Sequence, residues 1–277
     1  MAQMKATVFG AGGFIGSRLA AHLRALGWEV QSLHRGDEGW RERDLGHVFY
    51  CVGLTADFRT RPFETIDAHV GLAVDVLRRG RFESLLYLSS TRVYAKSGSG
   101  EETTPLLVDP TDPSDLYNLS KLMGEAACFA VDNPNVRVAR LSNVFGHGMG
   151  DANFLTSVLR EAIRTGAVEL RQALDSAKDY VALNDVLEAL VCVSVAGRER
   201  LYNVASGRNV THAQIVQAVQ DLTGCSVSVA PASPTSRFPA IVIDRLVNLG
   251  VRPSGEVTGA LASLIRDFRL PSKDSSC

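Results

Sequence analysis

The feature that most constrains the fold is a glycine-rich segment near the start of the chain. Ala6 to Phe9 predicts a short buried strand, and Gly10-Ala11-Gly12-Gly13-Phe14-Ile15-Gly16 follows it directly. Apolar residues then recur at helical spacing until Gly27. A strand, a glycine turn and a helix in this order are what a dinucleotide-binding loop requires. The sequence therefore predicts an α/β fold, a Rossmann-type doubly wound parallel sheet.

Three glycines of this turn have separate physical roles. Gly10 permits the tight turn, Gly13 lets the backbone approach a pyrophosphate at the positive end of the helix, and Gly16 allows close packing. Phe14 and Ile15 lie between them, and we expect both to contact the cofactor. The alternative is a glycine turn with a structural role alone.

The end of the second predicted strand, Trp28 to Leu33, bears on the choice of nicotinamide cofactor. An acidic residue there would bind the ribose hydroxyls of NAD, but this chain has His34 and Arg35. Arg35 can grip a 2′-phosphate with two parallel hydrogen bonds, which favours NADP. NAD remains the alternative, because Asp37 follows closely and Arg35 could be an ordinary surface arginine.

A second constraining stretch is Tyr117-Asn118-Leu119-Ser120-Lys121, at the start of a predicted helix from Tyr117 to Val131. Residues four apart share one face of a helix, so the phenol and the ammonium can address the same volume. A nearby cation stabilises a phenolate and lowers the phenol pKa from its usual value near 10. This pair predicts proton transfer, although an amphipathic helix with a solvated lysine has the same spacing.

Hydroxyl side chains follow another predicted strand, Ser84 to Leu88. Ser89, Ser90 and Thr91 come at its carboxyl end, the edge where open parallel sheets bind ligands. We expect Ser90 and Thr91 to face a substrate, where a hydroxyl can polarise a carbonyl beside Tyr117. Turn formation alone also explains such residues.

The remaining pattern predicts two domains. Residues 1–142 form the dinucleotide-binding domain, residues 143–270 form mainly a small α/β substrate domain with segments returning to the main sheet, and 271–277 are a tail. The predicted elements are helices over 63–79, 153–164, 184–195, 211–222 and 256–268, and strands over 47–51, 136–141, 179–181 and 201–204.

Composition excludes several classes of function. The net charge is −1 and the pI is about 6.6, so the chain has no electrostatic footprint for nucleic acid. Five scattered cysteines without a Cys-x-x-Cys motif indicate reduced thiols and no metal site. We find no leader and no apolar run of the ~20 residues that span a membrane, and we expect a soluble, cytoplasmic protein.

Five motifs together resemble the extended short-chain dehydrogenase/reductase family, in its branch of nucleotide-sugar epimerases, dehydratases and 4-keto reductases. The resemblance covers nearly the whole chain. The motifs are Gly10 to Gly16, Leu88 to Tyr94, Tyr117 to Lys121, Arg140 to Gly146, and Lys178-Asp179-Tyr180-Val181 with Asp185.

The resemblance implies a role for each matching residue. Ser90 would bind the substrate oxygen, Tyr117 would transfer its proton, and Lys121 would bind the nicotinamide ribose and hold the tyrosine pKa down. Asn143 matches a position that contacts substrate phosphate. The resemblance also implies cofactor contacts for Val52, Gly53 and Leu54, for His34 and for Arg35.

Three departures from the family pattern narrow the prediction. The Asp-Glu pair of the dehydratases is replaced by Thr91-Arg92, which disfavours sugar dehydration. His69 stands where the family usually has asparagine. The segment between Leu33 and His47 is too short for the usual strand and helix.

The function predicted from the sequence is an NADP-dependent reductase that converts a ketone, a 4-keto nucleotide sugar, into a secondary alcohol. The first alternative is an NAD-dependent nucleotide-sugar C4 epimerase, and the second is a non-catalytic NADP-binding regulator. We also expect a homodimer formed through the predicted helices that begin at Phe63 and Tyr117.

Overall fold

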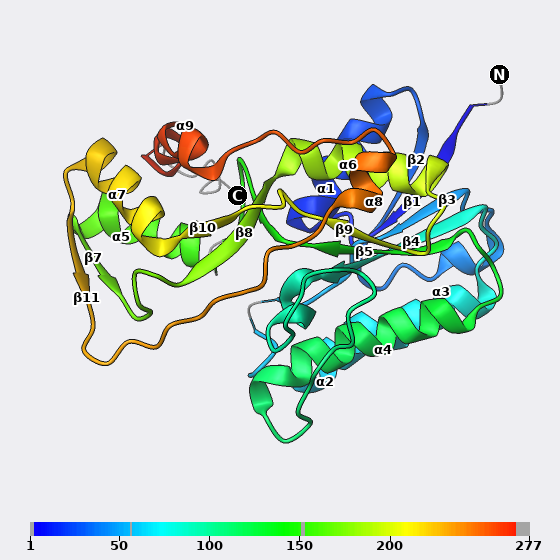
Figure 1. Cartoon of the computed structure of the whole chain (residues 1–277). Helices are drawn as coiled ribbons and strands as arrows, with labels where there is room; N and C mark the ends of the chain where they lie inside the picture. The colour runs from blue at the N-terminus through cyan, green and yellow to red at the C-terminus, as the bar shows by residue number, and fades with distance from the viewer. Residues whose placement is uncertain (1–2, 56, 151–152, 270–277) are drawn as a thin grey trace.

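The computed structural model describes residues 3–55, 57–150 and 153–269, and the predicted tail lies outside them. Its larger lobe is built on a parallel six-stranded sheet in the order β2-β1-β3-β4-β5-β9 (Figure 1). The strands are β1 (Lys5–Phe9), β2 (Glu29–Leu33), β3 (His47–Tyr50), β4 (Ser84–Ser90), β5 (Val136–Leu141) and β9 (Leu201–Val204). The predicted Rossmann-type sheet is confirmed.

Helices cover both faces of this sheet, because its strands are apolar on both sides. Apolar residues of α1 (Phe14–Ala25) and α6 (Leu183–Ala196) pack on one face. Residues of α3 (Leu72–Arg79) and α4 (Leu116–Ala130) pack on the other. Figure 1 shows the two layers above and below the strands.

A short connection joins β2 to β3, as the sequence predicted. A single 3₁₀ turn, Gly39–Glu42, replaces the usual strand and helix, so β3 pairs directly with β1. Trp40 in this turn is buried, and its ring meets the Phe9 ring edge-on at 5.6 Å. Trp40 thereby joins the apolar cluster on the face of the sheet that α3 and α4 cover.

The helix predicted over 63–79 is interrupted. The structure has α2 (Pro62–Ile66), a π-helical turn (Asp67–Gly71) and then α3. A π turn shifts the backbone hydrogen bonds by one residue, and two tyrosine hydroxyls from the sheet donate to backbone carbonyls of this turn. Tyr50 Oη donates to the Ala68 carbonyl at 2.6 Å, and Tyr87 Oη donates to the His69 carbonyl at 3.0 Å. The sequence pattern of the helix alone did not show these partners.

A smaller lobe has its own apolar core. It contains a three-stranded sheet, β10-β8-β6, and a parallel pair, β11-β7. Its elements are β6 (Asn143–Phe145), α5 (Phe154–Thr165), β7 (Ala167–Leu170), β8 (Ala177–Ala182), β10 (Asn209–Thr211), α7 (His212–Thr223), β11 (Ser226–Val229) and α9 (Val257–Arg269).

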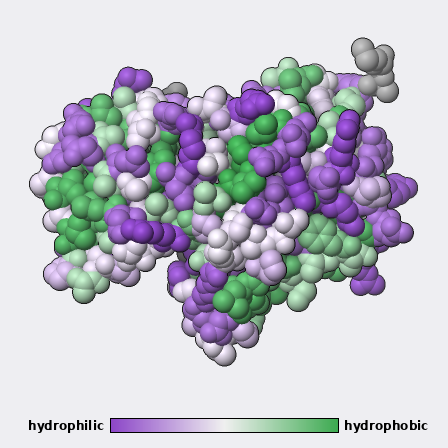
Figure 2. All heavy atoms as spheres, viewed as in Figure 1, coloured by the Kyte–Doolittle hydropathy of each residue, from purple (hydrophilic) through white to green (hydrophobic). Residues whose placement is uncertain are grey.

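The two lobes are connected repeatedly. After β8 the chain returns to the large lobe for α6 and β9, and after β11 it returns again for α8 (Asp244–Asn248), which packs beside β9. The surface is indented between the lobes (Figure 2). None of the helices within the described ranges is long and apolar enough to cross a membrane.

Candidate active site

A cavity of about 600 Å³ lies at the carboxyl ends of the central strands, between the two lobes. Among the residues predicted for the site, it is lined by Gly13, Phe14, Ile15, Val52, Gly53, Ser90, Thr91, Tyr117, Lys121 and Asn143. Gly10, Gly16, His34, Arg35 and Leu54 do not line it. Most of the predicted residues therefore meet in one place.

The glycine turn has the shape that the sequence requires. Gly10 has a φ of +77°, in the left-handed region that favours glycine. A Cβ on Gly16 would lie 2.2 Å from the Gly10 carbonyl oxygen, so only glycine fits there. Gly13 precedes α1 and places no side chain over its first turn, whose N–H groups are left free to bind a phosphate. These residues fit a dinucleotide.

The end of β2 carries both a basic and an acidic group. Arg35 is exposed, and its charge lowers the pKa of the Glu64 carboxyl, although no ion pair or hydrogen bond joins these two described residues. The Asp37 carboxylate accepts a hydrogen bond from the His34 backbone N–H at 3.5 Å. The His34 ring lies over the turn, 3.3 Å from where a Cβ of Gly12 would be. The end of β2 therefore presents an exposed guanidinium, Arg35, beside a carboxylate, Asp37, that already accepts a hydrogen bond.

Tyr117 is buried at the start of α4, next to a hydroxyl. Asp112 accepts a hydrogen bond from the Ser114 N–H and so begins the turn Pro113–Asp115 that leads into this helix. Burial raises the pKa of Tyr117, whereas hydrogen bonds with the side chains of Ser90 and Thr55 lower it. The structure thus brings the predicted serine and tyrosine together.

Two cations lie near the end of β4: Lys121 faces the Leu88 carbonyl and the Tyr87 ring, and Arg92 faces Tyr117. Lys121 Nζ donates to the Leu88 carbonyl at 2.9 Å, and burial lowers the pKa of this ammonium to about 7. The Arg92 guanidinium lies 5.8 Å from the Tyr117 ring centroid, and its charge lowers the tyrosine pKa. Arg92 is therefore a nearby cation that the sequence identified only as a departure from the dehydratase pattern.

His69 supports both the tyrosine and the cofactor segment. Its Nε2 accepts the Leu54 backbone N–H at 3.2 Å, so the ring proton lies on Nδ1, 2.8 Å from Ser120 Oγ. Ser120 in turn donates to the Tyr117 carbonyl at 2.9 Å. Burial lowers the pKa of His69 to about 2, which keeps the ring neutral. The His69 side chain therefore fixes the segment Val52 to Leu54, which is predicted to contact the cofactor, relative to α4.

The wall formed by the small lobe carries Asn143 and Lys178. Asn143 Nδ2 donates to the Asp179 carbonyl at 2.8 Å. The Asp179 carboxylate accepts hydrogen bonds from Ser142, Ser206 and Arg208. Burial and the charge of Arg92 lower the pKa of Lys178. Asp179 is the sole acidic residue among the described lining residues, and its oxygens are engaged.

A buried network lies behind the serines at the end of β4. Arg140 binds Glu125 through Nε at 3.0 Å and Nη2 at 2.6 Å, and Glu125 accepts the Ser89 hydroxyl. Arg140 Nη1 also donates to the Tyr94 hydroxyl at 2.7 Å. This network holds β4, β5 and α4 together under the cavity. In the described part of the chain, no cluster of three histidine, cysteine or acidic residues could hold a metal.

Residues 6–205 match the model of the NAD dependent epimerase/dehydratase family. The chain belongs to this family. The resemblance inferred from the five motifs is thereby confirmed, as is the expectation of an oxidoreductase of the nucleotide-sugar epimerase/dehydratase type that depends on NAD or NADP.

Curated relatives are distant. An uncharacterized epimerase/dehydratase of Staphylococcus haemolyticus is 24% identical over 59% of this chain and 53% of its own, so the match spans about half of that relative. A UDP-glucose 4-epimerase of Corynebacterium glutamicum is 22% identical over 87% of each chain.

Solved structures of similar fold contain either cofactor. RMD from Pseudomonas aeruginosa, complexed with NADPH, has a TM-score of 0.77 at 22% identity and covers 96% of this chain and 99% of its own. A UDP-glucose 4-epimerase from Thermus thermophilus, complexed with NAD, has a TM-score of 0.78 with the same identity and coverage.

Proposed function

We propose that this protein is an NADP-dependent reductase that converts the ketone of a 4-keto nucleotide sugar into a secondary alcohol. The observation that carries the proposal is that Ser90 and Tyr117 line one cavity, with the Ser90 side chain lowering the tyrosine pKa, and that this cavity offers no free carboxylate among its described lining residues. A dehydratase needs an acid and a base beside the hydroxyl. Thr91 and Arg92 at those places supply neither.

In the proposed reaction, two hydroxyl groups, those of Ser90 and Tyr117, act on the substrate oxygen. Ser90 donates a hydrogen bond to the ketone oxygen, and Tyr117 gives its phenolic proton to the same oxygen as the alcohol forms. The nicotinamide, when bound, supplies the hydride. Arg92 stabilises the phenolate that remains, because its charge lowers the tyrosine pKa, and Lys121, whose ammonium donates to the Leu88 carbonyl, would bind the nicotinamide ribose.

Arg35 supports NADP as the cofactor. Its guanidinium is exposed at the end of β2 and forms no ion pair within the described ranges, so it is free to bind a 2′-phosphate. The glycine turn would hold the pyrophosphate at the start of α1. Val52 and Gly53 would contact the dinucleotide, since both line the cavity.

The test is an assay of NADPH oxidation with a panel of 4-keto sugar nucleotides. The loss of reduced-nicotinamide absorbance is the readout. We expect turnover by the wild-type protein, and a ~10²- to 10⁴-fold lower kcat for Tyr117→Phe with an unchanged Kd for NADPH. Tyr202→Phe is the control, because it removes a buried phenol whose hydroxyl accepts N–H groups far from the cavity. Absence of turnover with every ketone would refute the proposal.

A C4 epimerase is the second candidate, favoured by Asp37 at the end of β2 and by the Corynebacterium glutamicum relative. An epimerase would retain NAD through purification and interconvert sugar epimers without net NADPH oxidation. The third candidate, a regulator that only binds NADP, would keep its biological effect in the Tyr117→Phe variant. The same set of assays therefore distinguishes all three.

A further inference from the structure

The Arg92 side chain packs with two aromatic rings, Phe58 and Tyr117. Its guanidinium lies 5.4 Å from the Phe58 ring centroid and 5.8 Å from that of Tyr117, and the two rings are 5.6 Å apart. Arg92 lines the cavity together with Ser90, two residues earlier in the chain. A group that binds Arg92 therefore also lies beside the tyrosine and serine at which the reacting carbon must sit.

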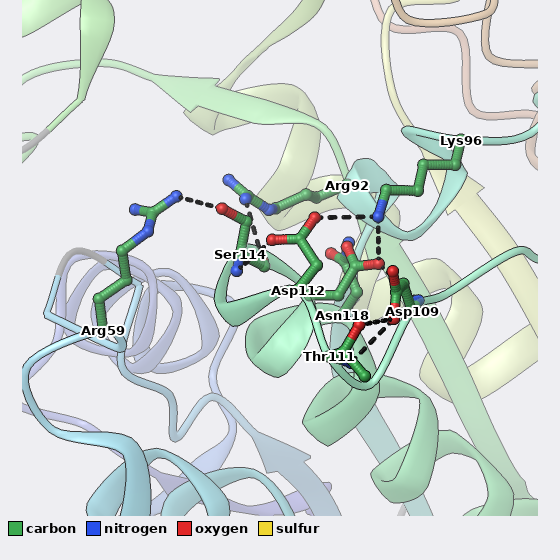
Figure 3. A network of polar contacts seen from close by, with 9 residues as sticks. Arg59, Arg92, Lys96, Asp109, Thr111, Asp112, Ser114 and Asn118 are labelled. Carbon is green, nitrogen blue, oxygen red and sulfur yellow. Dashed lines mark hydrogen bonds and ion pairs between the residues drawn. The ribbon is translucent and has the colours of Figure 1, made fainter.

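A second guanidinium approaches from the segment after β3. Arg59 lies 4.5 Å from the Phe58 ring centroid and donates to Ser114 Oγ at 3.1 Å, while Arg92 donates to the Ser114 carbonyl at 3.3 Å. Figure 3 shows both side chains directed toward Ser114 from opposite sides. Two positive groups thus converge on Ser114, and Arg92 is the one of the two that lines the cavity.

Neither arginine has a carboxylate partner among the described residues. The nearest acids are already engaged, because Lys96 binds Asp112 at 3.0 Å and Asp115 at 2.6 Å. Figure 3 shows the Asp112 carboxylate turned toward Lys96. Arg92 Nε is fully buried and has no hydrogen-bond acceptor. Burial and the charge of Arg59 lower the pKa of Arg92, and the charges of Asp115 and Asp112 offset this only in part.

A half-buried guanidinium with an unused donor is costly unless an anion binds it. The planar fork of arginine matches a carboxylate with two parallel hydrogen bonds. The position beside Tyr117 places that carboxylate on the reacting sugar, because the nucleotide phosphates are not at the carbon that exchanges hydride. Lys178, on the opposite wall, remains available for those phosphates.

We infer that the substrate sugar is a uronate, and that Arg92, with Arg59 beside it, binds the carboxylate on C5 of the ring. This inference rests on the proposed function and names the substrate class of the same site. It makes Arg92 a specificity-determining residue. At the position of Arg92 the dehydratases have an acidic residue that takes part in proton transfer at the substrate. In this chain the residue at that position binds the substrate carboxylate instead.

The experiment compares nucleotide-linked uronates with the corresponding hexoses and 6-deoxyhexoses. It runs in the oxidative direction, with NADP⁺ reduction followed by absorbance, because a 4-keto uronate is a β-keto acid that loses carbon dioxide. We expect wild-type kcat/KM to favour the uronate by roughly 10- to 100-fold. Arg92→Gln should remove this preference by lowering kcat/KM for the uronate more than for the neutral sugars, with which only the loss of charge beside Tyr117 is felt, and Arg92→Lys should give an intermediate value.

Two further variants separate recognition from folding. Arg59→Gln should lower the uronate kcat/KM by a smaller factor than Arg92→Gln. Arg61→Gln, two residues away and paired with Glu64, should leave it unchanged. Thermal unfolding and the Kd for NADPH identify any variant that is misfolded. Equal wild-type kcat/KM values for the acidic and neutral sugars, or an equal loss for both in Arg92→Gln, would overturn the inference and leave the proposed function standing.

Calorimetry provides a readout that does not need turnover. The Kd of the nucleotide uronate should rise roughly 10- to 100-fold in Arg92→Gln, whereas the Kd of the parent nucleoside diphosphate should stay the same. If both rise together, Arg92 binds phosphate and the inference is wrong. If no sugar nucleotide is oxidised but the uronate binds through Arg92, the proposed function fails and the substrate class stands.

Discussion

The His69 imidazole meets the Tyr117 ring edge-on, with the ring centroids 5.3 Å apart and the ring planes at 88°. The same imidazole accepts the Leu54 N–H and bonds Ser120 in α4. One neutral side chain therefore sets the position of the phenol relative to the segment that is predicted to contact the cofactor.

His69 should make the protein sensitive to acid. Burial lowers its pKa to about 2 in the folded state, against about 6.5 in the unfolded chain, so below pH ~6.5 the unfolded state binds the extra proton. The free energy of unfolding should fall by up to ~1.4 kcal/mol per pH unit on this account. Urea unfolding of wild type and His69→Asn between about pH 7.5 and 5.5 checks it: the asparagine variant should have the shallower slope, and identical slopes would contradict the assignment.

Arg35 should determine the preference for NADP over NAD. Arg35→Ala removes a charged hydrogen bond to the 2′-phosphate, so the KM for NADPH should rise roughly 10- to 100-fold while the KM for NADH stays constant. Steady-state kinetics with both cofactors measures this. Arg198→Ala, an exposed arginine ahead of β9, is the matched control. If the KM values for NADPH and NADH rose together, Arg35 would have a structural role and would not select the 2′-phosphate.

The pair Glu125 and Arg140 should behave as one unit. Arg140→Met leaves a buried carboxylate without its partner and should cost about 3–5 kcal/mol of unfolding free energy. The double variant Glu125→Met, Arg140→Met removes both charges and should be less destabilised than the single one. Urea unfolding of the three proteins measures the coupling. A double variant at least as unstable as Arg140→Met would show that the apolar pair cannot replace the ion pair.

The helices α2 and α4 should form a dimer interface. Phe63 is 77% exposed and Met123 is 58% exposed. The surface over α4 is largely apolar in Figure 2, and apolar patches of this kind commonly mark protein contacts. Light scattering of the wild-type protein should give a dimer, and Phe63→Glu with Met123→Glu should give a folded monomer. A wild-type monomer at micromolar concentration would rule the interface out.

Strong local patterns predicted the larger elements well. The helix expected over 117–131 is Leu116–Ala130, and the strand expected over 136–141 is found with those bounds. The short elements β6, β7, β10, β11 and α8 were missed. They have three to five residues each, and their pairing depends on partners far away in the chain.

The site was predicted where motif and sheet edge coincide. Ser90 and Tyr117 come together because the end of β4 and the start of α4 meet at the same edge. Ser90 itself lies within β4 and not in the turn after it. Phe58, Arg59 and Thr55 were not singled out as individual residues, because the irregular segment after β3 has no periodic pattern. The sequence did contain one signal for Arg92 as a site residue: it is a cation two residues after the predicted catalytic Ser90.

The path of the chain between the lobes limits how this enzyme can be divided or recombined. The chain passes from β5 to the small lobe, back for α6 and β9, out again for β10 to β11, back for α8 and out for α9. A fragment that stops at residue 142 would lack β9, so β5 would become an open sheet edge prone to aggregation. Exchanging the smaller lobe with that of a relative therefore requires several simultaneous junctions. Substrate specificity is more readily altered by single substitutions at the cavity between the lobes.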